Sequence, residues 1–254
     1  MSRSRLPAVL STLYQPLRRL AEWVYPTGCI ICGRECGPAV AVCHICRRRL
    51  PFFDFPVCPI CGNFARDRLP HRGCITDPAV GPSLVWFAGL LDEGYRPLVH
   101  ALKYERQLSI GEFLGRRIGR VLAKSFPGRG PAPRVIPVPL HPSRQKQRGY
   151  NQSDAIATGL ARTTGFPLDH NLLVRIRKTK DQTKLSPKER IANVRGAFKV
   201  SRPGSFAGRQ VFLVDDVMTT GATLAECIRV ISADDADDVQ AVVLTLARPI
   251  SAPP

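Results

Sequence analysis

Two adjacent carboxylates and a hydroxyl-rich turn follow one apolar segment of this chain. The segment, residues 211–214, is rich in β-branched residues and is typical of a strand buried on both faces. Asp215 and Asp216 come next, where such a strand would reach the edge of its sheet. Residues 219–223 supply threonine hydroxyls and a glycine, and residues 224–231 have apolar positions at helical spacing. We therefore predict a turn at a helix N-terminus, where N–H groups and the helix dipole favour an anion.

The acids and the turn suit one kind of ligand. A helix N-terminus accepts a monophosphate, and neighbouring carboxylates accept hydrogen bonds from vicinal hydroxyls, so a sugar phosphate with a free diol satisfies both. Two adjacent buried acids without such a partner would repel each other and raise the pKa of one of them. The alternative interpretation is an ordinary strand–turn–helix corner with solvated acids. A Walker phosphate loop is excluded, because the chain contains no Gly-Lys dipeptide.

Eight of the nine cysteines lie between residues 29 and 74. Six of them form three Cys-x-x-Cys pairs, Cys74 follows in a His-x-x-Cys pair, and Cys36 is a spare thiol. A two-residue spacer lets both members of a pair reach one tetrahedral zinc ion, so we predict two structural zinc sites. In the sequential pairing the ligands are Cys29, Cys32, Cys43 and Cys46 at the first site and Cys58, Cys61, His71 and Cys74 at the second. The spacing leaves a cross-braced arrangement open.

Basic residues exceed acidic ones by a wide margin. Among 254 residues there are 37 Lys and Arg against 20 Asp and Glu, which gives a net charge of +17. Such a surface suits polyanions, either nucleic acid or phosphorylated substrates, although an arginine-rich compositional bias is the alternative. We find neither a run of 18 apolar residues nor a secretory signal, so we expect no membrane span, a cytoplasmic location and reduced cysteines.

The remaining predicted elements alternate between strand and helix. Further strands are expected at residues 83–91, 134–140 and 239–246, and helices at residues 95–104, 111–126 and 151–160. This alternation indicates an α/β fold with a parallel sheet, whose ligand lies at the carboxyl edge of the strands. Within the basic segment 175–199, Ser186 and Glu189 predict a capping box at a helix start. Lys103 is assigned a structural role by default.

Three of these features resemble one known family. Residues 215–223 resemble the ribose-phosphate motif of type I phosphoribosyltransferases. The run Arg-Gly-Tyr-Asn-Gln-Ser at residues 148–153 and the cysteine module resemble the ComF/GntX family in particular. The resemblance implies a parallel-sheet type I phosphoribosyltransferase fold with a small N-terminal zinc-ribbon module. We expect an amphipathic helix in residues 1–27, a double zinc ribbon in 28–80 and the transferase-like domain in 81–254. His71 departs from the family pattern, which usually has a fourth Cys-x-x-Cys there.

The resemblance also implies a site for 5-phosphoribosyl-1-pyrophosphate with Mg²⁺. Asp215 and Asp216 would hold the ribose hydroxyls, and a mobile hood would add Lys184 and Arg190 as further catalytic residues. The 5′-phosphate would lie in the turn formed by Val217, Met218, Thr219, Thr220, Gly221, Ala222 and Thr223. The diphosphate would lie against Pro139 and Leu140, with Arg148, Asn151 and Gln152 near it.

Two functions follow from the resemblance. The first is a phosphoribosyltransferase or a related enzyme, which would displace diphosphate from the ribose anomeric carbon toward an acceptor that the sequence does not identify. The second is a non-catalytic competence factor, because ComF relatives are associated with DNA uptake and GntX relatives with gluconate use. Its partner would be single-stranded DNA or a DNA-uptake helicase. The aromatic content of 7%, dispersed along the chain, argues against a base-stacking platform.

Overall fold

The computed structural model describes residues 28–37, 40–69, 74, 81–92, 94–126, 131–180 and 185–247. The chain divides into two compact units, Met1–Arg49 and Leu50–Pro254. The division falls inside the segment 28–80 in which the zinc ribbon is predicted, and the helix predicted in 1–27 lies outside the described residues. Over the described residues, no helix is both long and apolar enough to span a bilayer.

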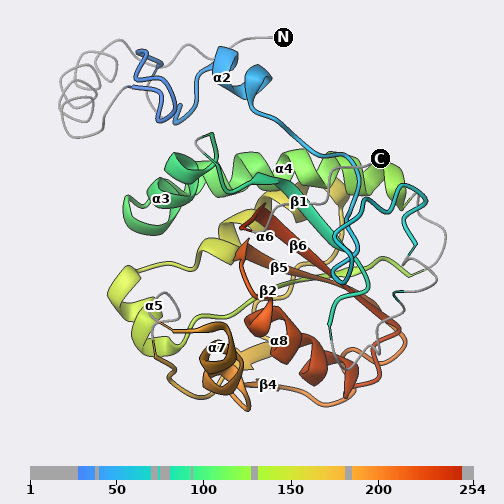
Figure 1. Cartoon of the computed structure of the whole chain (residues 1–254). Helices are drawn as coiled ribbons and strands as arrows, with labels where there is room; N and C mark the ends of the chain where they lie inside the picture. Colours follow the sequence, from blue (N-terminus) through green and yellow to red (C-terminus); the bar gives the residue numbers. More distant parts are fainter. Residues whose placement is uncertain are drawn as a thin grey trace, which may run out of the picture. The chain divides into compact units, whose positions relative to one another are not determined.

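The second unit contains a four-stranded parallel sheet in the order β1-β6-β5-β2 (Figure 1). Its strands are β1 Val85–Leu90, β2 Arg134–Pro137, β5 Gln210–Met218 and β6 Asp238–Leu246. The central strands β5 and β6 pair from Gln210 opposite Asp238 to Met218 opposite Leu246. Residues 211–214 and 241–244 are fully buried, as expected for strands covered on both faces. The predicted parallel α/β fold is confirmed.

Helices cover both faces of this sheet (Figure 1). On one face α4 (Leu108–Ser125), which α3 (Arg96–Tyr104) contacts, packs against α6 (Gln152–Thr164), and α8 (Ala222–Ser232) lies on the other face. Glycines allow α4 and α6 to approach closely. A Cβ atom on Gly115 would lie 2.1 Å from the carbonyl oxygen of Ile156, and one on Gly159 would lie 2.2 Å from that of Glu112.

Two predicted strand ends were wrong. β5 continues through Met218 instead of ending at Val214, because its pairing with β6 extends to Leu246. Asp215 and Asp216 are therefore part of the strand, near its carboxyl end. β2 ends at Pro137, short of the predicted Leu140: the Val138 N–H still donates to the Val214 carbonyl at 2.8 Å, but Pro139 lacks the N–H group that a longer ladder needs.

Several short elements complete the fold. α5 (Pro142–Arg148) follows β2, β3 (Leu173–Arg175) pairs antiparallel with β4 (Phe198–Val200), and α7 (Pro187–Val194) lies between those two strands in the chain. The first unit contains α2 (His44–Arg49). α7 begins with the predicted capping box: the Ser186 hydroxyl accepts from the Glu189 N–H, and the Glu189 carboxylate accepts from the Ser186 N–H at 2.8 Å.

Candidate functional site

The acid pair at the end of β5 is held by three elements. Oδ1 of Asp215 accepts hydrogen bonds from the Ser153 hydroxyl on α6, at 3.1 Å, and from the backbone N–H of Asp216, at 2.9 Å. Oδ1 of Asp216 lies 3.2 Å from Nζ of Lys103 on α3. Burial, together with the charge of Asp216, raises the pKa of Asp215 to about 7. The pair thus carries less than its full negative charge near neutral pH.

The threonine-rich turn joins β5 to α8. Gly221 is the N-cap of α8 and has a φ of 74°, a left-handed conformation that glycine adopts without strain. A small hollow of about 30 Å³ lies in this turn beside the acid pair. Its lining residues are Asp215, Val217, Met218, Thr219, Gly221, Thr223 and Leu224. None of them carries a positive charge, so an anion here would depend on backbone N–H groups, hydroxyls and the helix dipole.

A larger cavity of about 230 Å³ adjoins the small hollow, with which it shares Asp215, Val217, Thr219 and Thr223. Besides Asp215 and Asp216, it is lined by five cationic side chains, Lys103, Arg144, Arg148, Arg175 and Arg190. These cations come from α3, α5, β3 and α7, so the cavity depends on segments far apart in the sequence. Five cations facing two carboxylates give a strongly positive wall, which suits a polyanionic ligand.

The structure brings many of the predicted ligand residues to these two hollows, but not all of them. Pro139, Leu140, Arg148 and Gln152 line the larger cavity, and Nη1 of Arg190 donates to the Thr219 hydroxyl at 3.1 Å. Thr220 and Ala222 line neither hollow; the Thr220 hydroxyl accepts from the Ala222 N–H at 3.4 Å. Lys184 lies outside the described residues.

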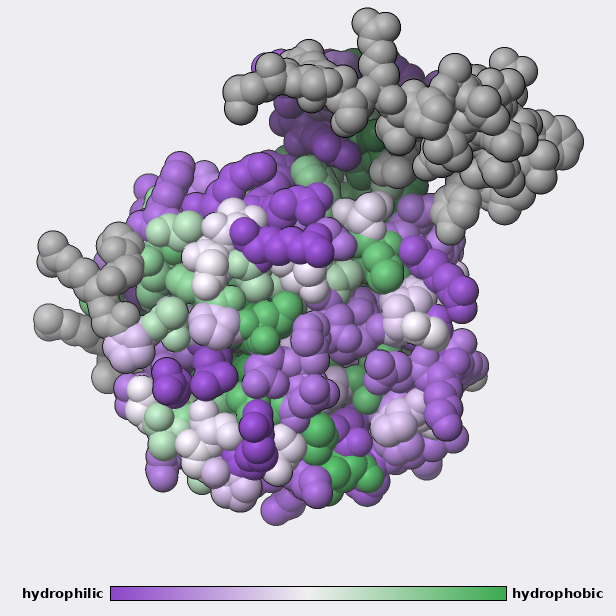
Figure 2. Space-filling view, turned by 180° about the vertical axis from the view of Figure 1, so that it is seen from behind, coloured by the Kyte–Doolittle hydropathy of each residue, from purple (hydrophilic) through white to green (hydrophobic). Residues whose placement is uncertain are grey.

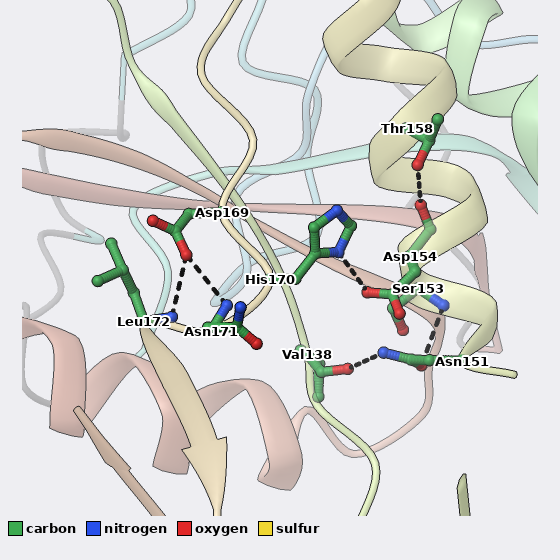
Figure 3. Close-up of polar contacts among 9 residues, drawn as sticks. All are labelled: Val138, Asn151, Ser153, Asp154, Thr158, Asp169, His170, Asn171 and Leu172. Carbon is green, nitrogen blue, oxygen red and sulfur yellow. Dashed lines mark hydrogen bonds and ion pairs between the residues drawn. The ribbon is translucent and has the colours of Figure 1, made fainter. Parts of the chain in front are cut away.

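Asn151, which was predicted to lie near the diphosphate, lines neither hollow, and its side chain connects two segments of the backbone (Figure 3). Its amide nitrogen donates to the Val138 carbonyl at 3.0 Å, and its amide oxygen accepts from the Ser153 N–H at 3.3 Å, which caps α6. Asn151 therefore ties the segment after β2 to the start of α6. This contact helps to place Ser153 against Asp215, and the predicted contact of Asn151 with a ligand stays a prediction.

Three cationic residues of the larger cavity were absent from the predicted ligand set. Lys103, for which a structural role was the default, reaches Asp216, and Arg144 and Arg175 line the larger cavity. In the sequence, Lys103 is one polar residue of an amphipathic helix, and Arg144 and Arg175 are each one of several neighbouring basic residues. Neither pattern distinguishes a cavity residue from a solvated one.

Four cysteines of the first unit converge on one point. The sulfur atoms of Cys29, Cys32, Cys43 and Cys46 all lie within 4.8 Å of one another. The sulfurs of Cys32 and Cys43 are 3.8 Å apart. Four sulfurs placed tetrahedrally at the usual Zn–S distance would be separated by about 3.8 Å, so the cluster fits zinc. Burial and the neighbouring thiols raise the pKa of Cys46 to about 12, an effect that a bound cation would offset.

A second cluster lies in the second unit. The sulfurs of Cys58, Cys61 and Cys74 are again within 4.8 Å of one another, whereas His71 lies outside the described residues. This grouping of the described cysteines is the sequential one. The loop that carries Cys58 is anchored on the sheet, because Val57 and Val85 of β1 exchange backbone hydrogen bonds of 2.9 and 3.0 Å.

The two clusters begin with the same backbone turn. The Gly33 N–H donates to the Cys29 carbonyl at 2.7 Å, and the Gly62 N–H donates to the Cys58 carbonyl at 2.9 Å. Both glycines have a positive φ, of 69° and 73°. The repeated Cys-x-x-Cys-Gly sequence thus produces the same turn twice, and each turn directs its two thiols to one side.

Comparison with known families finds two matches, each over one part of the chain. Residues 20–75 match the model described as "Double zinc ribbon domain", and residues 148–254 match "Phosphoribosyl transferase domain". The DNA utilization protein YhgH of Salmonella typhimurium is 32% identical over 78% of this chain and 94% of its own length. Competence protein F of Haemophilus influenzae is 32% identical over 82% and 90%, and competence protein ComFC of Bacillus subtilis is 27% identical over 75% and 79%.

Proposed function

The chain belongs to the ComF family, and from this premise we propose that the small hollow and the larger cavity together bind 5-phosphoribosyl-1-pyrophosphate with Mg²⁺. One observation carries the proposal: Asp215 lines both a small hollow without cations and a larger cavity with five of them, and Asp216 lines the larger one. The small hollow in the turn, whose lining has no cation but offers hydroxyls and a helix N-terminus, suits one phosphate. The larger cationic cavity suits a second, more highly charged group, and the acids suit the hydroxyls of the sugar that joins them.

Each part of the ligand would have its own receptor. Asp215 and Asp216 would accept hydrogen bonds from the two ribose hydroxyls, and the turn that follows them would donate to the 5′-phosphate. The diphosphate would lie among the arginines of the larger cavity. Mg²⁺ prefers oxygen ligands, so the diphosphate and the two carboxylates would hold it, and it would neutralise charge on the departing diphosphate.

Transfer of the phosphoribosyl group is the reaction that this arrangement favours. The bond between the anomeric carbon and the diphosphate oxygen breaks, and the diphosphate leaves with the electron pair while an acceptor supplies the new bond. Negative charge grows on the leaving group, where Arg144, Arg148 and Arg190 stabilise it. The acid pair orients the sugar and stabilises its developing positive charge. Protein side chains then act by position and charge, without a covalent intermediate.

Calorimetry with two matched double variants tests the binding. The wild-type protein is expected to bind 5-phosphoribosyl-1-pyrophosphate in the presence of Mg²⁺. Asp215→Asn with Asp216→Asn should weaken binding by at least about 100-fold, because two charge-assisted hydrogen bonds are lost. The control is Asp235→Asn with Asp237→Asn, which makes the same charge change at two exposed acids before β6. Equal affinity of both double variants would reject the site.

The two cysteine clusters and the double zinc ribbon match support zinc binding. We propose Cys29, Cys32, Cys43 and Cys46 as the ligands of one ion, and Cys58, Cys61, His71 and Cys74 as those of the other. In both sites protein ligands fill all four positions. The zinc would therefore stabilise structure and take no part in the reaction.

Handling of single-stranded DNA is a second candidate function. The relatives named for DNA utilization and for competence favour it, as does the net charge of +17. Hydrophilic residues cover much of the face shown in Figure 2, with hydrophobic residues in smaller areas between them. A salt series with an oligonucleotide tests this candidate, because affinity that depends on phosphate contacts falls steeply with added salt. No measurable binding at low salt would reject it.

A further inference from the structure

Arg175 reaches the larger cavity from β3, outside the parallel sheet. Its guanidinium stacks over the Phe198 ring, 5.1 Å from the ring centre, and its Nη2 donates to the hydroxyl of Thr179, which is itself buried. The third donor position, Nε, is buried and has no hydrogen-bond partner among the residues that the structure describes. Arg175 is therefore held in place by an aromatic ring and a hydroxyl, and within the described part of the chain it forms no ion pair with a carboxylate.

Gln152, which lines the same cavity, also has a buried hydrogen-bond donor without an acceptor among the described residues. Its side chain is 2% exposed, and its amide nitrogen has no acceptor within the described part of the chain. Buried polar atoms in folded proteins nearly always have a partner, and each unsatisfied donor costs about 1–3 kcal/mol. Two such donors on one cavity wall indicate that an acceptor from outside the protein belongs there.

The charges around the cavity indicate which acceptor this is. Lys103 already pairs with Asp216, and Arg190 already donates to Thr219 and to the Leu185 carbonyl. Burial lowers the pKa of Arg175, so the guanidinium pays a desolvation cost that a neighbouring anion would offset. Arg175 lines the larger cavity but not the small hollow in the β5–α8 turn. An anion at Arg175 would thus lie in the larger cavity, outside the small hollow of the turn.

We propose that Arg175, assisted by Gln152, is the residue that recognises the diphosphate of bound 5-phosphoribosyl-1-pyrophosphate, an inference that rests on the proposed function. A guanidinium offers several N–H donors in a rigid plane and can bind two phosphoryl oxygens at once. Its stacking on Phe198 fixes the orientation of that plane. Arg175 therefore determines specificity: it lets the cavity distinguish a sugar that carries a diphosphate from ribose 5-phosphate.

The test compares three ligands on one set of variants by calorimetry with Mg²⁺ present. The ligands are 5-phosphoribosyl-1-pyrophosphate, inorganic diphosphate and ribose 5-phosphate. Arg175→Met should weaken the two diphosphate-containing ligands by about 30-fold or more and change ribose 5-phosphate less than about threefold. Arg175→Lys keeps the charge and loses the planar fork, so an intermediate loss is expected. Arg202→Met, which removes a 73% exposed arginine that lines neither hollow, is the control.

The outcomes separate this inference from the proposed function. If the wild-type protein binds none of the phosphoribosyl ligands, the proposed function fails and this inference fails with it. If the wild-type protein binds 5-phosphoribosyl-1-pyrophosphate and Arg175→Met binds it equally well, only the present inference is overturned. An equal loss for all three ligands would also overturn it, because that result indicates a general structural role. Should Arg175→Met not fold, Arg175→Lys with Gln152→Met gives the same comparison with less disturbance.

Discussion

The cysteine clusters and the larger cavity differ in how far apart in the sequence their residues lie. Each Cys-x-x-Cys-Gly turn places its two thiols within five residues, as at residues 29–33 and 58–62. The cavity instead collects side chains from residue 103 to residue 223. A metal half-site is therefore a local property of the backbone. The proposed site for a large anion exists only after helices and strands have packed.

The two regions also differ in what they contribute to stability. A zinc ion bound by the clustered thiols would stabilise the first unit, since a structural zinc replaces the apolar core that a short segment lacks. The second unit has a hydrophobic core of its own, with β5, β6 and α8 fully buried at many positions. Its cavity adds a buried acid and unsatisfied donors, which cost stability. The proposed function is thus located where the fold is already stable enough to tolerate these costs.

Removing one metal site should give the largest effect. Cys29→Ser with Cys32→Ser is expected to lower the zinc content from two ions per chain to one and to unfold the described part of the first unit, because structural zinc contributes about 10–16 kcal/mol in small zinc domains. Binding of 5-phosphoribosyl-1-pyrophosphate should persist. Mass spectrometry for metals and limited proteolysis measure both results. Cys36→Ser, which removes a thiol outside the clusters, should keep both ions; a variant that still holds two ions without Cys29 and Cys32 would contradict the assignment.

Replacing Asp215, the acid whose pKa is raised, should increase the stability of the fold and weaken ligand binding. The pKa of Asp215 rises from an ordinary value of 3.8 to about 7 in the fold, so the native state binds one more proton than the unfolded state between those values. Stability is therefore lost as the pH rises from about 4 to about 7, and Asp215→Asn should restore up to about 4 kcal/mol at pH 8 and little at pH 4. Thermal unfolding at the two pH values measures this difference. A variant equally stabilised at both would show that charge is not the cause.

Crowding the contact between α4 and α6 should weaken the second unit alone. Gly115→Ala would place a methyl group against the Ile156 carbonyl, so we expect a loss of about 3 kcal/mol from overpacking. Affinity at the cavity should fall with it, because α6 carries Ser153 and Gln152. Gly81→Ala, where the added group meets no neighbouring atom, is the control. Urea denaturation measures the change, and equal midpoints for the two variants would contradict the close packing.

Removing the cap of α7 should have the smallest effect. Ser186→Ala loses the side-chain half of the capping box and should cost this helix about 1 kcal/mol. Because α7 carries Arg190, affinity for 5-phosphoribosyl-1-pyrophosphate should fall by about fivefold, without a change in zinc content. Amide hydrogen exchange in residues 187–194 reports the fraying directly. Unchanged exchange would mean that tertiary contacts alone hold the helix.

The strand–turn–helix corner was predictable because its signals are local. The apolar run before Asp215 requires a buried strand, and the threonines and Gly221 suit a helix N-terminus. The carboxyl end of the strand was misplaced at Val214, since β5 extends only because β6 pairs with it as far as Met218. β3 was not predicted at all: three residues are too few to show a periodicity, and its pairing with β4 is a long-range contact.

The sequence by itself determined the chelating pairs, the two turns that carry them and the acids at the end of a buried strand. Backbone geometry limits residues two to five positions apart to a few arrangements, so their spacing predicts what they can bind. Only the tertiary structure decided that Lys103 meets Asp216 and that Arg175 and Gln152 line one cavity. The members of each pair are more than 20 positions apart in the sequence, and their distance in space depends on how helices pack on the sheet, which no local pattern encodes.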